Sequence, residues 1–168
     1  LAATPNVAIN SGSFAAAPTS VALTSAAFPI GGTINSYWIA TAVTGSYDVN
    51  GVGGGGTFAS LTNAGGIVEF INNNIVTGDI TINITANLTG ETGTVALNAF
   101  ASPFTILIKP TGAPRNVTGT VAGNTMIRLN GASRVTFDGS TSGGTDRSLL
   151  VENLSATATG VFRLGSIG

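Results

Sequence analysis

Two carboxylates in the second half of the chain are the residues best suited to acid–base chemistry. Asp138 and Glu152 lie 14 positions apart, and each follows an apolar residue in a segment of alternating character. Side chains alternate between the two faces of a strand, so both carboxylates are expected to point outward. A pair of carboxylates supports glycoside hydrolysis. In that interpretation Arg128, Arg134 or Arg147 would hold the substrate.

A simpler interpretation of these charges is that they keep an outer face soluble, because opposite charges on neighbouring strands contribute little stability. The chain contains no His and no Cys, which excludes histidine-based triads, thiol nucleophiles and zinc sites built on those residues. We therefore predict that the protein is not an enzyme and has no catalytic, cofactor-binding or metal-ligating residues. A β-helix enzyme that cleaves polysaccharides with Asp138 and Glu152 is the alternative hypothesis.

Two further motifs have a functional and a structural interpretation. Residues 51–56 read Gly-Val-Gly-Gly-Gly-Gly and match the dinucleotide-binding pattern G-x-G-x-x-G. That fingerprint requires a βαβ unit, and no second helical pattern follows, so we interpret the segment as a hinge. Asp146 follows Gly143 and Gly144, but the Gly-Gly-x-Gly-x-Asp repeat of calcium-binding solenoids is absent. A turn aspartate is the favoured interpretation.

Composition restricts the class of protein and its partners. Charged residues make up 8% of the chain, apolar residues 43%, and the net charge is −1. The basic residues are interleaved with acidic ones and form no basic stripe, so nucleic acid is not an expected partner. Pro18 and Pro29 interrupt the most apolar early stretch, and we expect no membrane-spanning segment. A cysteine-free chain of low charge, rich in Thr, Gly and Asn, indicates an extracellular bacterial surface protein.

Short apolar segments recur about every 22 residues in the second half of the chain. Their central residues are Ile82, Ile106, Ile127 and Leu149, separated by 24, 21 and 22 positions. A near-constant period of this size is typical of a solenoid, whose coils bury their apolar faces by stacking. Alternation within the segments predicts the inward side chains, which are Ile80, Ile82, Ile84, Ala86, Leu88, Ile106, Ile108, Ile127, Leu129, Val135, Phe137, Leu149, Val151, Phe162 and Leu164.

The chain divides by composition into four parts. Residues 1–50 are predicted to be a β-rich connector or the end of a preceding β domain, with short strands at Val21–Leu23, Ser36–Ile39 and Ser46–Val49. Residues 51–57 are the glycine-rich hinge. Residues 58–74 show helical spacing, with Ser60 and Thr62 as N-caps, and predict a helix that covers the first coil. Residues 75–168 are the coils, which we expect to continue beyond the chain end.

Three segments in order resemble a known family. They are the run from Gly56 to Asn72, Ile106-Leu-Ile-Lys-Pro110, and the run from Met126 to Gly139 with its Leu-Asn-Gly and Phe-Asp-Gly corners. Together they resemble the right-handed parallel β-helix modules of large secreted, adhesin-like surface proteins of Bacteroidota, many of which are cargo of the type IX secretion system. The resemblance covers about residues 46–168. It implies an all-β, right-handed parallel β-helix with an N-terminal capping helix.

The favoured function is a structural or adhesive module at the cell surface, acting as a stalk or binding surface. Its expected partners are surface glycans, neighbouring copies of itself and other domains of a longer parent chain. A self-assembling filament subunit is a further alternative, in which residues 1–50 supply strands to an adjacent subunit.

Overall fold

The computed structural model describes residues 41–157 and 159–165. The chain separates into two units, 1–42 and 43–168, and the second contains nearly all the described residues. The strands predicted at Val21–Leu23 and Ser36–Ile39 lie outside the described residues, as does most of the predicted connector. The third predicted strand, Ser46–Val49, forms the second half of a longer strand.

The described unit consists of ten strands and one short helix. In chain order they are β1 Ala42–Val49, α1 Ile67–Asn72, β2 Ile75–Ile84, β3 Leu88–Thr89, β4 Leu97–Asn98, β5 Ile106–Pro110, β6 Arg115–Gly119, β7 Thr125–Asn130, β8 Val135–Phe137, β9 Leu149–Asn153 and β10 Gly160–Gly165. Among the described residues no helix has the length and apolar character that a bilayer crossing requires.

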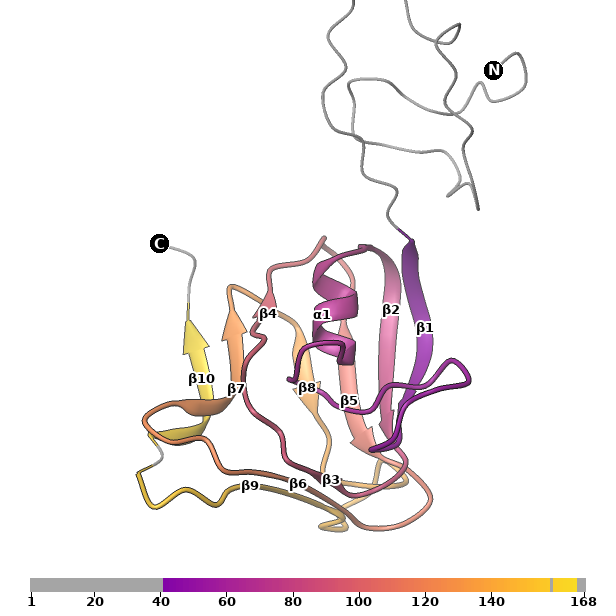
Figure 1. Cartoon of the computed structure of the whole chain (residues 1–168). Coiled ribbons are helices and arrows are strands. Elements are labelled where there is room, and N and C mark those ends of the chain that lie inside the picture. Colours follow the sequence, from indigo (N-terminus) through magenta and orange to yellow (C-terminus); the bar gives the residue numbers. More distant parts are fainter. Residues whose placement is uncertain (1–40, 158, 166–168) are drawn as a thin grey trace, which may run out of the picture. The chain divides into compact units, whose positions relative to one another are not determined.

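The strands form three separate sheets, with orders β1-β2-β5-β8, β3-β6-β9 and β4-β7-β10. From β2 onward the chain enters the three sheets in rotation, so that β2, β3 and β4 are followed by β5, β6 and β7 and then by β8, β9 and β10. Figure 1 shows β3, β6 and β9 along the bottom of the view and β4, β7 and β10 toward the left. The strands from β2 to β10 pair in parallel.

The predicted right-handed parallel β-helix with about 22 residues per coil is wrong, although the predominance of strands agrees with the broader expectation. The structure has three short sheets rather than a regular solenoid. Ile80 pairs with Ile106, 26 positions later, whereas Leu129 pairs with Leu164, 35 positions later. The four segments of the sequence ladder do not form one stack, because they belong to β2, β5, β7 and β9 of three different sheets.

The core nevertheless follows from side-chain alternation. Ile80, Ile82 and Ile84 on β2 are buried, as predicted. Ile80 and Ile82 are in register with the buried Ile106 and Ile108 of the paired strand β5. β-Branched side chains fit such a pleated, buried surface and restrict the backbone toward strand conformations. The buried residues of all three sheets and of α1 belong to one hydrophobic cluster.

Alternation fails at the last strand. Phe162 and Leu164 were predicted to be inward, but they are 45% and 78% exposed. They lie on β10, which is an edge strand of its sheet, and the alternation pattern cannot report whether a further layer covers the inner side of a strand. Of these two side chains, Phe162 is partly packed, through an edge-to-face contact with Phe137 at 4.8 Å between ring centroids.

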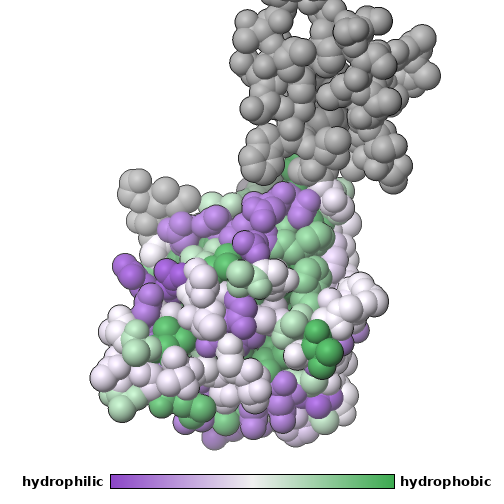
Figure 2. All heavy atoms as spheres, viewed as in Figure 1, coloured by the Kyte–Doolittle hydropathy of each residue, from purple (hydrophilic) through white to green (hydrophobic). Residues whose placement is uncertain are grey.

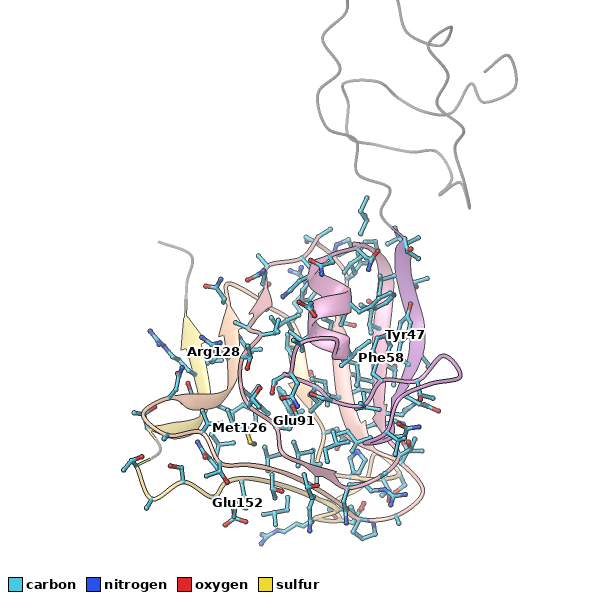
Figure 3. The ribbon with its side chains drawn as sticks, in the orientation of Figure 1. Tyr47, Phe58, Glu91, Met126, Arg128 and Glu152 are labelled. Carbon is cyan, nitrogen blue, oxygen red and sulfur yellow. The ribbon has the colours of Figure 1, made fainter. Side chains whose placement is uncertain are left out.

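The predicted helix over residues 58–74 is much shorter in the structure, because α1 begins only at Ile67. Phe58 instead pairs with Val49 in an isolated bridge, and its ring packs against Tyr47 and Phe70. These rings tie β1 to the helix (Figure 3). The glycine run before Phe58 forms turns in which the Asn50 side chain accepts hydrogen bonds from two backbone N–H groups.

A buried carboxylate fixes the loop that leads into α1. Glu91 is only 2% exposed and accepts hydrogen bonds from Ser60 Oγ (3.1 Å), Leu61 N (2.9 Å), Thr62 N (2.7 Å) and Thr62 Oγ1 (2.6 Å). Ser60 and Thr62, predicted as helix N-caps, therefore bind a side chain about 30 positions away. Because charge-assisted hydrogen bonds offset the cost of burying a carboxylate, this arrangement anchors the loop on the segment after β3. Figure 3 shows Glu91 inside the unit, below α1.

Gly119, the last residue of β6, permits this anchor to form. A Cβ atom at Gly119 would overlap the backbone oxygen of Glu91 and lie 3.0 Å from Met126 Sδ. Gly139 is a matched contrast, because a Cβ atom there would meet nothing within 4 Å.

We predict that Gly119→Ala destabilises the protein by about 2–3 kcal/mol, because backbone atoms must move to admit the methyl group. Gly139→Ala should change the free energy of unfolding by less than about 1 kcal/mol. Urea unfolding of the two variants and the wild type measures both values. Equal effects of the two substitutions would show that the contact at Gly119 does not constrain the fold.

Candidate functional site

The structure places the two candidate catalytic carboxylates on different sheets. Asp138 directly follows β8, and its Oδ1 accepts a hydrogen bond from Ser140 N at 2.9 Å. Glu152 is exposed on β9, in register with Thr118 of β6. Neither carboxylate lines either of the two surface hollows described below. Neither of these two hollows is therefore a common cleft for the pair.

The three candidate substrate-binding arginines are also separated. Arg134 Nε donates to the Phe104 carbonyl oxygen at 2.9 Å, and its guanidinium lies 5.9 Å from the centre of the Phe100 ring. Arg147 is exposed in the loop before β9. Of the three, Arg128 lines one of the two hollows described below, and Arg134 and Arg147 line neither.

Asp146 is held by the loop that contains it. Its carboxylate accepts hydrogen bonds from the hydroxyl groups of Ser140 and Ser148 and from the Thr141 backbone N–H and hydroxyl. The hydrogen bond from Ser140, followed by those from Ser148 and Thr141, lowers the pKa of Asp146 well below its ordinary value. Within the described ranges no three acidic residues are grouped as a metal site would require. Asp146 therefore acts as an acceptor that closes a turn.

Three asparagine side chains form a ladder across α1, β4 and β7. Asn72, at the end of α1, donates to the Ala96 carbonyl oxygen (2.7 Å) and accepts from Asn98 N (3.0 Å). Asn130 Nδ2 in turn donates to Asn98 Oδ1 at 2.9 Å. These bonds leave the Asn98 amide NH₂ and the Asn130 amide oxygen without a protein partner in the described part of the chain. Both residues are exposed, so one donor group and one acceptor face solvent side by side.

Arginines continue this polar surface onto β10. Arg128 of β7 and Arg163 of β10 are in register on neighbouring parallel strands. Both line a hollow of about 180 Å³ together with Ala96, Leu129, Asn130 and Gly165. We call the surface formed by Asn72, Asn98, Asn130, Arg128 and Arg163 the polar strip. Hydrophilic residues gather over the upper ends of β4 and β7 in Figure 2, and Figure 3 shows Arg128 beside β7 and β10.

A second hollow, of about 250 Å³, lies at the other end of the polar strip. Asn72 and Asn98 line it together with apolar side chains that include Ile71 and Phe100. The Asn98–Asn130 hydrogen bond links the two hollows, because each hollow is lined by one of these residues. The strip therefore runs from a partly apolar hollow to a cationic one.

The charges at the cationic end are uncompensated by acidic side chains. Like charges in register on neighbouring strands repel, and among the described residues neither arginine forms an ion pair with a carboxylate. Arg128 Nη2 donates to the carbonyl oxygens of Gly93 (2.5 Å) and Thr94 (2.9 Å). In the described part of the chain Arg128 Nε is buried without an acceptor, an arrangement that typically costs about 1–3 kcal/mol. Two guanidinium groups that line one hollow are suited to binding an anion.

The sequence contains a signal for this site that a 22-residue period does not reveal. The tripeptides Ile127-Arg-Leu129 and Phe162-Arg-Leu164 lie 35 positions apart, and the dipeptides Leu97-Asn98 and Leu129-Asn130 lie 32 positions apart. Both spacings equal the pairing offsets of the sheet formed by β4, β7 and β10. These residues can be recognised as neighbours only once the strand pairing is known.

Comparison with known proteins found no matching family model, no similar curated protein and no similar solved structure.

The hydrogen bonds of Asp146 make stability depend on pH in the acid range. A carboxyl group whose pKa is lowered on folding stabilises the folded state above its ordinary pKa of 3.8, and this stabilisation is lost as the pH falls below that value. We predict that Asp146→Asn reduces the loss of stability between about pH 6 and about pH 2. Glu152→Gln, at an exposed carboxylate, is the control. Unfolding curves at several pH values give the free energy of unfolding as a function of pH. If that dependence is the same in Asp146→Asn as in the wild type, the Asp146 hydrogen bonds do not cause it.

Proposed function

We propose that the chain is a structural and adhesive module of an extracellular bacterial surface protein, and that its polar strip binds a glycan. The observation that carries this proposal is the asparagine ladder between two hollows, in which the amide NH₂ of Asn98 and the amide oxygen of Asn130 have no protein partner among the described residues. Location at the cell surface and export by the type IX secretion system are part of the proposal. The cysteine-free, Thr-, Gly- and Asn-rich composition supports the location, and the resemblance of three segments to secreted modules supports the export route.

The chemistry of the polar strip matches a sugar. Sugar hydroxyl groups both donate and accept hydrogen bonds, and a primary amide offers both kinds of group in one plane. Phe100 lines the neighbouring hollow and supplies an apolar ring surface of the kind that packs on the C–H face of a pyranose. The hollows are smaller than the roughly 300–1,000 Å³ of sites for drug-sized ligands, so each suits a single sugar ring.

The position of the strip on the sheets also supports an adhesive role. Asn98 and Asn130 are in register on the parallel strands β4 and β7. Leu97 of β4 and Ile127 of β7 are buried in the core and hold these strands in place. Side chains supported by strands keep a more constant geometry than side chains on loops. A surface of this kind binds without a large ordering cost, because the groups that contact the ligand are already placed.

We predict that Asn98→Ala and Asn130→Ala each weaken glycan binding by about five- to tenfold, the effect of losing about one hydrogen bond. A glycan array identifies ligands of the isolated chain, and titration calorimetry with the best ligand gives the dissociation constants. Asn116→Ala on β6 is the matched control, because Asn116 is exposed on a different sheet. Failure of the wild type to bind any glycan would overturn the proposal, as would an equal loss in Asn116→Ala.

A further inference from the structure

We infer that the glycan bound by the polar strip is anionic, and that its acidic group lies in the hollow between Arg128 and Arg163. This inference rests on the proposed function and names the ligand class. The acidic group is a carboxylate or a sulfate, since both present the paired oxygen atoms that guanidinium groups bind.

The register of β7 and β10 brings the two cationic side chains to one place. Arg128 and Arg163 are direct partners in a parallel pair, and neighbouring strands lie about 4.8 Å apart. Both side chains line the same hollow of about 180 Å³. An anion between them would replace the repulsion of two like charges by two attractive interactions.

The contacts of Arg128 orient its guanidinium and leave part of it available. The carbonyl oxygens of Gly93 and Thr94 hold Nη2, and within the described residues Nη1 has no acceptor. Nε is buried, so Nη1 is the nitrogen that a ligand in the hollow can reach. Arg163 is exposed, and its side chain forms no hydrogen bond in the described part of the chain. One arginine is therefore fixed by the fold, and the other is free to close on a ligand.

The neighbouring amides add a requirement for hydroxyl groups. Asn130 lines the same hollow as the two arginines, and within residues 41–157 and 159–165 its amide oxygen has no protein partner. A ligand that places an acidic group over β7 and β10 would direct its adjacent hydroxyl groups toward Asn130 and Asn98. A simple anion such as acetate satisfies only the first of these contacts, so an acidic sugar is favoured over a free ion.

Calorimetric titrations with two matched pairs of ligands test the inference. One pair is oligogalacturonate and its methyl ester, and the other is a sulfated galactan oligosaccharide and its desulfated form. For at least one pair, the charged member should bind at least about tenfold more tightly than the neutral member. This preference should weaken as salt rises from about 20 mM to about 500 mM. The pair that shows it identifies the acidic group, and sodium acetate should bind far more weakly than either charged oligosaccharide.

Arg163→Gln should reduce the preference for the charged ligand to about twofold or less. Its thermal unfolding should match that of the wild type, because the Arg163 side chain is exposed and makes no hydrogen bond among the described residues. Arg147→Gln, which removes an exposed arginine outside both hollows, should retain the full preference. Arg163→Lys keeps the charge without the planar fork and should give an intermediate value.

The outcomes separate failure of this inference from failure of the proposed function. Equal binding of charged and neutral members in both pairs would overturn the inference and leave glycan binding in place. An equal loss of preference in Arg163→Gln and Arg147→Gln would overturn it too, because net charge rather than the hollow would then explain the result. Absence of binding to all four oligosaccharides and to a wider glycan array would overturn both.

Discussion

Hydrogen bonds to the buried Glu91 carboxylate set the position of the loop before α1 and, through it, of the polar strip. A carboxylate that is 2% exposed is costly unless its oxygen atoms are hydrogen-bonded, and four donors from Ser60, Leu61 and Thr62 meet that requirement. The same residues lead into α1, since Ile67 N donates to the Ser60 carbonyl oxygen. One side chain thus holds the loop, the beginning of the helix and the segment after β3 together.

Both ends of the polar strip are positioned from this anchor. At one end, Thr62 accepts from Gly93 N and Val95 N, which fixes the segment whose Gly93 carbonyl oxygen holds Arg128. At the other end, the helix that follows the loop ends at Asn72, which binds the backbone of β4 on either side of Leu97. The strip is polar and exposed, but its geometry is set by buried hydrogen bonds.

The sequence predicts the local structure well and the long-range pairing poorly. Alternation identifies the buried faces of β2 and β5, because Ile80, Ile82 and Ile106 face a core on a regular pleat. The 22-residue period fails because three sheets alternate along the chain, so that successive apolar segments belong to different sheets. Ser60 and Thr62 resemble helix caps in sequence, but their hydroxyl groups donate hydrogen bonds to the Glu91 carboxylate, about 30 positions away. Because strand pairing is not known from the sequence, the pairs Arg128–Arg163 and Asn98–Asn130 can be recognised only once the pairing offsets of 35 and 32 positions are known.

Hydrogen exchange of the wild type and Glu91→Gln tests the central role of the anchor most directly. The account predicts faster exchange at the amides of Leu61 and Thr62, and also at Val95 and Asn98, whose backbone bonds depend on the anchored loop and helix. Protection at Ile106, in the sheet of β2 and β5, should persist. Faster exchange confined to Leu61 and Thr62, or no change at any of these amides, would contradict the claim that Glu91 positions the polar strip.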